Sequence, residues 1–187
     1  MVWVKSGYLP LDLGESIVKP LSELTVEMKA LVTATLLFLG VGILMALAYL
    51  DFSHIGSNGS PVLSVHDIAA TYYGPGVGYV TLLSLAHIHM MGLSTVFFVV
   101  GYIFVHSSFP TRWKAALAVL PFVAFLLDVS GWFLTKLDYE WVYLVILGGG
   151  TFVLSVATMI LLSLWDIWVR PHVQEVIVAA DQRYGVS

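Results

Sequence analysis

Two histidines and one aspartate stand in stretches that are otherwise apolar enough to lie within a membrane. His87 and His89 occur in LLSLAHIHMMGLSTVFFVVGYIF, residues 82–104, and Asp128 occurs in FLLDVSGWF, residues 125–133. Polar side chains at membrane depth are costly unless a partner compensates them. An imidazole in such a place can bind haem iron, another metal, a quinone or a proton. What these side chains do therefore depends on what faces each of them.

His87 and His89 cannot serve one ligand from the same side, because residues two apart on a helix point about 200° away from each other. The face of His87 is the more polar one, and we expect it to line the interior of a helix bundle. The face of His89 is aliphatic, so we expect lipid, a second subunit or a flat apolar ligand there. The His87 face also carries Ser84, Met90, Met91, Ser94 and Tyr102, and the His89 face carries Leu82, Leu85, Leu93, Val96 and Val100.

Asp128 is the one charged residue that we assign to the core of a span, and it requires a hydrogen-bond donor. It lies about eight residues from the end of its span, and His87 lies about nine residues from the neighbouring end of the preceding span. The two depths predict a His–Asp pair between these spans. The face of Asp128 also carries Ala124, Gly131 and Trp132, and its small residues permit a close helix approach. We expect the interior of the outer half to be built from this face, the His87 face and a stripe of the last span that begins in the GGG run at 148–150.

Haem b is the leading interpretation of this pattern. Either His87 or His89 supplies an axial imidazole, and Asp128 orients the ligand ring or anchors the bundle. Covalent haem c is excluded because the chain has no cysteine. The other spans have no histidine in their cores, so the second ligand is expected from a loop, and His66 is our first choice. The remaining candidates are His54, Met45, Met90, Met91 and a group from another chain.

Three alternatives stay open. His66, His87 or His89 with Asp128 would suit copper or zinc, and methionines such as Met91 favour copper(I). A buried His–Asp pair could instead pass protons or donate a hydrogen bond to a quinone, with Tyr79 and Trp132 nearby. Finally, the pair could be a purely structural contact between spans in a cofactor-free anchoring subunit.

The composition indicates a membrane protein. Of the 187 residues 59% are hydrophobic and only 11% are charged, against roughly a quarter charged in a soluble domain. The net charge is −4, and Lys and Arg are scattered, so no nucleic-acid partner is expected. The chain has no P-loop, G-x-S-x-G or H-E-x-x-H motif, and we expect no independent catalytic activity.

Four segments are long and apolar enough to cross a bilayer, which takes about 20 residues. They are residues 29–50, 78–106, 113–136 and 139–169, and because backbone groups in lipid must be satisfied internally, they predict an all-α integral membrane four-helix bundle. Residues 1–28 form a surface arm, 29–169 the membrane domain, 51–77 a long outer loop with a short helix near 64–73, and 170–187 a tail.

The distribution of Lys and Arg predicts both termini in the cytoplasm. The loop 51–77 then faces outward, toward the periplasm if the membrane is the bacterial cytoplasmic membrane. The sequence thus favours a small multi-pass subunit of a respiratory or photosynthetic electron-transfer assembly, with haem b in its outer half. Its expected partners are the lipid bilayer, other membrane subunits or a second copy, and a periplasmic cytochrome. A metal- or proton-handling transporter is the remaining functional alternative.

Overall fold

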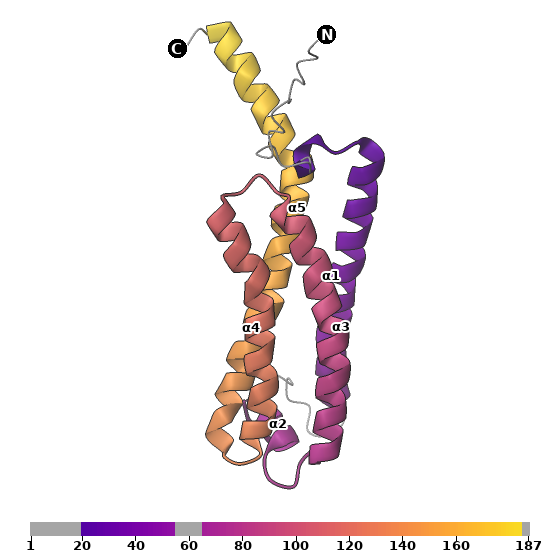
Figure 1. Ribbon diagram of the computed structural model, residues 1–187, viewed down its shortest axis with the longest axis vertical. Helices are drawn as coiled ribbons and strands as arrows, with labels where there is room; N and C mark the ends of the chain where they lie inside the picture. The colour runs from indigo at the N-terminus through magenta and orange to yellow at the C-terminus, as the bar shows by residue number, and fades with distance from the viewer. Residues whose placement is uncertain (1–19, 55–64, 185–187) are drawn as a thin grey trace, which may run out of the picture.

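Four long helices lying side by side build the protein (Figure 1). The computed structural model describes residues 20–54 and 65–184. The long helices are α1 (Val26–His54), α3 (Tyr79–Val105), α4 (Thr111–Thr135) and α5 (Val142–Tyr184). Short elements join them, namely η1 (Leu21–Glu23), α2 (Val65–Tyr72) and η2 (Tyr139–Trp141), and the described residues contain no strand. We call the end of the bundle at which α2 lies the α2 end.

Each of the four predicted spans coincides with one of the long helices. The segments able to cross a membrane are Val26–Tyr49, Tyr79–Val105, Thr111–Thr135 and Tyr139–Pro171. The chain turns where the sequence offers helix breakers, at Gly74–Gly78 before α3 and at Ser107–Pro110 before α4. The prediction of an all-α four-helix membrane protein is confirmed.

The closest helix contact is the one between α4 and α5, and it depends on glycine. A Cβ atom built on Gly148 would lie 2.5 Å from the backbone nitrogen of Asp128 and 2.7 Å from the carbonyl oxygen of Ala124. A Cβ atom on Gly131 would lie 2.9 Å from the backbone nitrogen of Val145. The two backbones therefore touch, as small residues permit in membrane helices. The close helix approach predicted from the small residues on the Asp128 face is thus found, and the helix that approaches is α5.

Helix α1 is attached more loosely than the other three. Among its described residues only Leu36 is fully buried. Its polar link to the bundle is a hydrogen bond of 2.9 Å from the Trp168 indole Nε1 to the hydroxyl of Thr33. Most of the α1 surface thus faces lipid or another protein.

At the end opposite α2, a buried carboxylate holds the α3–α4 turn to α5. Asp166, 0% exposed, accepts hydrogen bonds from the backbone N–H and the hydroxyl of Ser108 at 3.1 and 3.2 Å, and Arg170 pairs with it at 3.3 Å. Asp166 lies near the end of the Tyr139–Pro171 span and not in its core, so it does not change the assignment of Asp128 as the one charged residue in a span core. Arg170, one turn later in the same helix, neutralises Asp166.

At the α2 end, a single lysine closes the turn between α2 and α3. The Lys136 ammonium donates to the carbonyl oxygens of Tyr72, Gly74 and Val77 at 3.4, 3.0 and 2.6 Å. Its three N–H donors thus match three carbonyls that follow the last turn of α2. This contact fixes α2 against the end of α4.

Replacing Lys136 by methionine should release this turn without unfolding the bundle, because the four long helices do not depend on it. We expect faster hydrogen exchange in residues 65–78 and unchanged exchange in α4 and α5. Lys136→Arg retains the charge and several donors, so its exchange rate in residues 65–78 should lie between those of the wild type and Lys136→Met. Equal exchange in the wild type and Lys136→Met would show that other contacts hold α2.

The C-terminal part of the chain continues α5 beyond the membrane segment. The helix runs through Pro171 to Tyr184 and projects past the bundle in Figure 1. The boundary predicted at residue 170 therefore lies inside a helix. The predicted arm 1–28 falls mostly outside the described residues, but its last part is seen, where the backbone N–H of Leu21 donates to the carbonyl of His106 at 3.1 Å.

Candidate functional site

The indole of Trp132 is the centre of an aromatic cluster near the α2 end. Tyr72 from α2 stacks on it with ring centroids 5.9 Å apart and planes 7° apart. His89 from α3 meets it edge-on at 5.8 Å, and Phe125, two turns away on α4, does so at 6.4 Å. Together with Asp128 we call these residues the Trp132 cluster. Three helices thus contribute to it.

His89 lies near the middle of a membrane span with one ring nitrogen fixed. It is ten residues from Tyr79, about 15 Å along the helix, in a hydrocarbon core about 30 Å thick. Its Nδ1 is 2.8 Å from the carbonyl oxygen of Leu85, which accepts only, so Nδ1 carries the proton. In the neutral ring Nε2 then keeps a free lone pair. The side chain is exposed although its helix position faces the bundle.

Asp128 is buried, at 5% exposure, in the contact between α4 and α5. Its Oδ1 accepts a hydrogen bond of 3.2 Å from the indole Nε1 of Trp132. The bare backbone of Gly149 lies beside it, since a Cβ atom there would be 3.6 Å from Oδ1. Asp128 therefore orients the indole against which His89 packs.

Tyr72 covers the other side of the cluster and lies outside the four spans. Burial, and to a smaller extent the nearby Asp128 carboxyl, raises the pKa of the Tyr72 hydroxyl to about 12. The phenol thus stays protonated across the physiological range and can donate a hydrogen bond throughout it.

This shift predicts an alkaline limit to stability. An unfolded tyrosine ionises at about pH 10, whereas folded Tyr72 ionises at about pH 12. Because the folded protein holds this proton more tightly, the stability linked to the raised pKa is fully present below the pKa of the unfolded tyrosine. It is lost as the pH rises from there through the pKa of folded Tyr72, about 12. A spectrophotometric tyrosine titration should show one late-ionising group that disappears in Tyr72→Phe. An unchanged titration in that variant would contradict the burial of Tyr72.

The predicted interior face of α3 is wrong. The buried residues of α3 are apolar and lie on the side of His89, whereas the side of His87 points outward. Polarity misled the prediction because lipid is as apolar as a protein core, so a bundle interior in a membrane need not be the polar side. The buried residues are Leu82, Ala86, Phe97, Val100, Gly101 and Phe104.

The predicted pairing of His87 with Asp128 is also not found. His87 is exposed, and in the described part of the chain no histidine donates a hydrogen bond to Asp128. His89 is linked to Asp128 only through Trp132. The predicted face of Asp128 itself is confirmed, since Ala124, Gly131 and Trp132 are all buried with it.

The other predicted ligands are not brought to His89. His66 is 85% exposed and lies 3.7 Å from Asp67 on the surface of α2. Met91 is 65% exposed on the outward side of α3, and Met45 is 68% exposed on α1. The side chain of His54 is outside the described residues. Among the described residues, no three His, Asp or Glu side chains come together in a way that could hold a metal ion.

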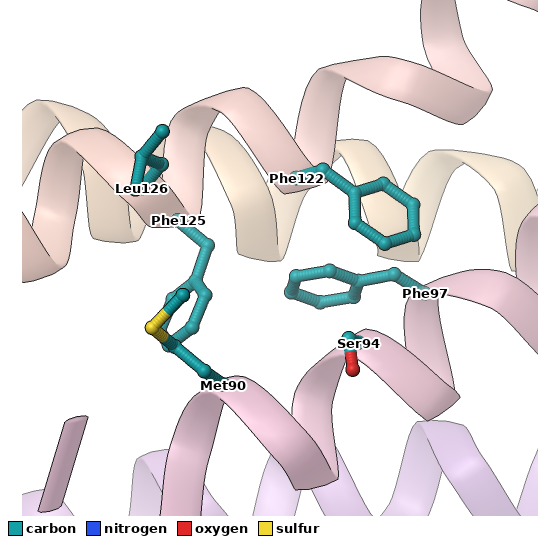
Figure 2. Close-up of a pocket in the computed structure, with 6 residues that line it drawn as sticks. All are labelled: Met90, Ser94, Phe97, Phe122, Phe125 and Leu126. Carbon is teal, nitrogen blue, oxygen red and sulfur yellow. The ribbon is translucent and has the colours of Figure 1, made fainter. Parts of the chain in front are cut away.

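A small cavity lies next to the cluster, between α3 and α4 (Figure 2). Its volume is about 80 Å³, far below the roughly 300–1,000 Å³ of ligand pockets. Phe97 and Phe122 meet there edge to face at 5.4 Å, and Met90 lies beside Phe125. The aromatic packing leaves no room for a large cofactor at this point between α3 and α4.

Taken together, these features define a multi-pass integral membrane protein whose polar cluster lies within a four-helix transmembrane bundle. A family model described as a transmembrane helical domain, Aq_1264_TM, matches residues 63–174, and the chain belongs to this family. The match covers α2 through most of α5, and hence the whole Trp132 cluster. No curated protein gives a significant match. No solved structure does either.

Sequence reasoning missed two contributors to the site. Neither Tyr72 nor Lys136 is among the predicted site residues. The stacking of Tyr72 on Trp132 follows from the tertiary position of α2, which the sequence does not show. The sequence does carry a signal for the Lys136 contact. Lys136 is the one Lys or Arg at that end, and the glycine-rich turn of residues 74–78 offers carbonyl groups to which it can donate.

Proposed function

We propose that this chain is a membrane subunit of an electron-transfer assembly and binds haem b through His89. The observation that carries the proposal is the anchored imidazole. Nδ1–H is held by the Leu85 carbonyl at 2.8 Å, so Nε2 is left as a free base deep in the membrane. Histidines that bind metals commonly donate their other ring N–H to a carbonyl or carboxylate, which fixes the ring and raises its basicity.

The surroundings of His89 support a flat apolar ligand. The ring stands edge-on to Trp132, and its side chain remains exposed. The cavity between α3 and α4 is too small for a porphyrin. Haem would therefore bind on the exposed side of His89, which would hold its iron. When bound, haem would supply one-electron chemistry, while His89 holds it and Trp132 orients His89.

The orientation of the bundle is part of the proposal. Arg112, Lys114 and Arg170 lie at the end opposite α2, and Lys136 at the α2 end is occupied by three carbonyls. The positive-inside tendency then puts both termini in the cytoplasm and the α2 end outside. In a bacterium the haem would face the periplasmic half of the membrane, where a soluble cytochrome could exchange electrons with it.

A haem titration tests this function. We expect hemin added to the purified protein in lipid nanodiscs to give a Soret band that saturates at one haem per chain, with quenching of tryptophan fluorescence. A band that grows without saturation would mean only that hemin dissolves in the lipid, and it would contradict the proposal.

A cofactor-free anchoring subunit is the second candidate, and one observation favours it. Asp128 already has its donor within the chain, from Trp132, and lies in the glycine contact of α4 with α5. The cluster would then serve only to hold α2, α3 and α4 together. This reading predicts a colourless protein that Asp128→Ala destabilises.

A further inference from the structure

The outward side of α3 carries a continuous stripe of exposed residues, several of which are polar. Successive members are three or four residues apart, so they lie along one line of the helix. Met91, Phe98 and Tyr102 are 65%, 64% and 57% exposed. We call this set the outward stripe, and its members are Ser84, His87, Met91, Thr95, Phe98 and Tyr102.

His87 is the residue of the stripe that most needs a partner. It lies eight residues after Tyr79, about 12 Å along the helix from the membrane boundary. His89 of α3 and His106, which directly follows α3, each donate Nδ1–H to the carbonyl four residues earlier, at 2.8 and 2.6 Å. The described part of the chain provides no such bond for His87. Its short side chain cannot reach the headgroups, so both nitrogens face hydrocarbon in the isolated chain.

We propose that the outward stripe is the interface between two copies of this chain, with the two His87 side chains paired within it. Both copies insert in the same direction, so the twofold axis that relates them must stand perpendicular to the membrane. Each residue of one copy then lies at the same depth as the equivalent residue of the other. A neutral imidazole has one donor and one acceptor. One His87 can therefore donate its N–H to the free ring nitrogen of the other.

A second copy fits this surface better than an unrelated helix would. The Thr95 hydroxyl donates to the Met91 carbonyl of its own helix. The other polar groups of the stripe are the Ser84 hydroxyl, the His87 imidazole and the Tyr102 hydroxyl, which lie at three depths, and each is both a donor and an acceptor. An unrelated partner would need matching groups at all three depths, whereas a second copy has them by symmetry. Serine, threonine and histidine side chains commonly hydrogen-bond between membrane helices. This inference does not depend on haem.

The absence of cysteine allows a clean test in native membranes. Ser84→Cys should form a disulfide-linked dimer of twice the chain mass upon mild oxidation with iodine. Leu154→Cys is the matched control, because Leu154 is 69% exposed on α5, away from the stripe, and it should stay monomeric. Equal crosslinking of both variants, no crosslinking of Ser84→Cys, or an adduct of any other mass would overturn the proposal.

The role of His87 itself is tested by dilution of labelled protein in lipid, with energy transfer reporting the dimer. His87→Leu should weaken association about 3- to 20-fold, the range of measured interhelical hydrogen bonds. His87→Gln keeps a donor and an acceptor and should retain most of the association. Association unchanged in His87→Leu, or lost equally in both variants, would contradict the pairing, and neither result depends on whether haem is bound.

Discussion

Replacing His89 by glycine is expected to abolish haem binding while leaving the protein folded. Among the described residues, His89 is the only histidine within a span that lies on the inward side of its helix. Loss of a hydrogen bond behind a metal ligand already costs about 10–100-fold in affinity, so loss of the ligand should cost more than about 100-fold. Absorbance during a hemin titration measures this directly.

Two nearby histidines provide matched controls for this result. His106 has the same hydrogen bond from Nδ1 to the carbonyl four residues earlier but lies just beyond the far end of α3. His87 lies two residues from His89 and faces outward. Both His106→Gly and His87→Gly should keep the Soret band. Added imidazole should restore the band in His89→Gly, because the free base can occupy the space that the side chain leaves.

This prediction separates a ligand from a structural histidine. A merely structural His89 would lower the thermal stability of the variant, and added imidazole would not restore any absorption. Retention of the full Soret band in His89→Gly, or its loss in His87→Gly instead, would show that we have assigned the wrong residue.

The largest expected effect on stability comes from Gly148→Ala. The added Cβ would lie 2.5 Å from the nitrogen of Asp128 and 2.7 Å from the oxygen of Ala124, both backbone atoms of α4. Backbone cannot turn aside as a side chain can, so α4 and α5 must separate. Overpacking typically costs about 1–3 kcal/mol, occasionally more, and we expect the upper part of this range.

The neighbouring glycines supply the control series. A Cβ atom on Gly150 meets nothing within 4 Å, and one on Gly149 comes no closer than 3.6 Å, to Asp128 Oδ1. Thermal unfolding in detergent should therefore show a large loss for Gly148→Ala, little change for Gly149→Ala, and no loss for Gly150→Ala. A stability of Gly148→Ala equal to that of Gly150→Ala would mean that α4 and α5 are not packed through their backbones.

The sequence was sufficient to predict the four spans and the buried face of α4 that carries Asp128. The spans follow from length and apolar composition, which membrane insertion requires whatever the tertiary structure. The buried face of Asp128 followed because a charged group must turn away from lipid and because Gly131 beside it permits close contact. Both arguments depend only on the residue itself, either on the cost of a polar group in lipid or on the space that a small side chain leaves. Neither requires knowing which helix packs beside it.

The inward face of α3 could not be predicted in this way. In water, the apolar side of a helix is the buried side, but in lipid both sides of α3 have apolar surroundings. The choice between His87 and His89 is made by Trp132 and by the packing of Phe97 and Val100 against the other helices. Tyr72 and Lys136 joined the site for a similar reason, since their contacts depend on how α2 folds back onto α4.

The most direct measurement is the absorption spectrum of the full-length protein purified from membranes of cells supplied with haem, first oxidised and then reduced with dithionite. The proposal predicts a Soret band and, after reduction, a sharp α band at the position typical of b-type haem. A colourless preparation of folded protein would contradict it.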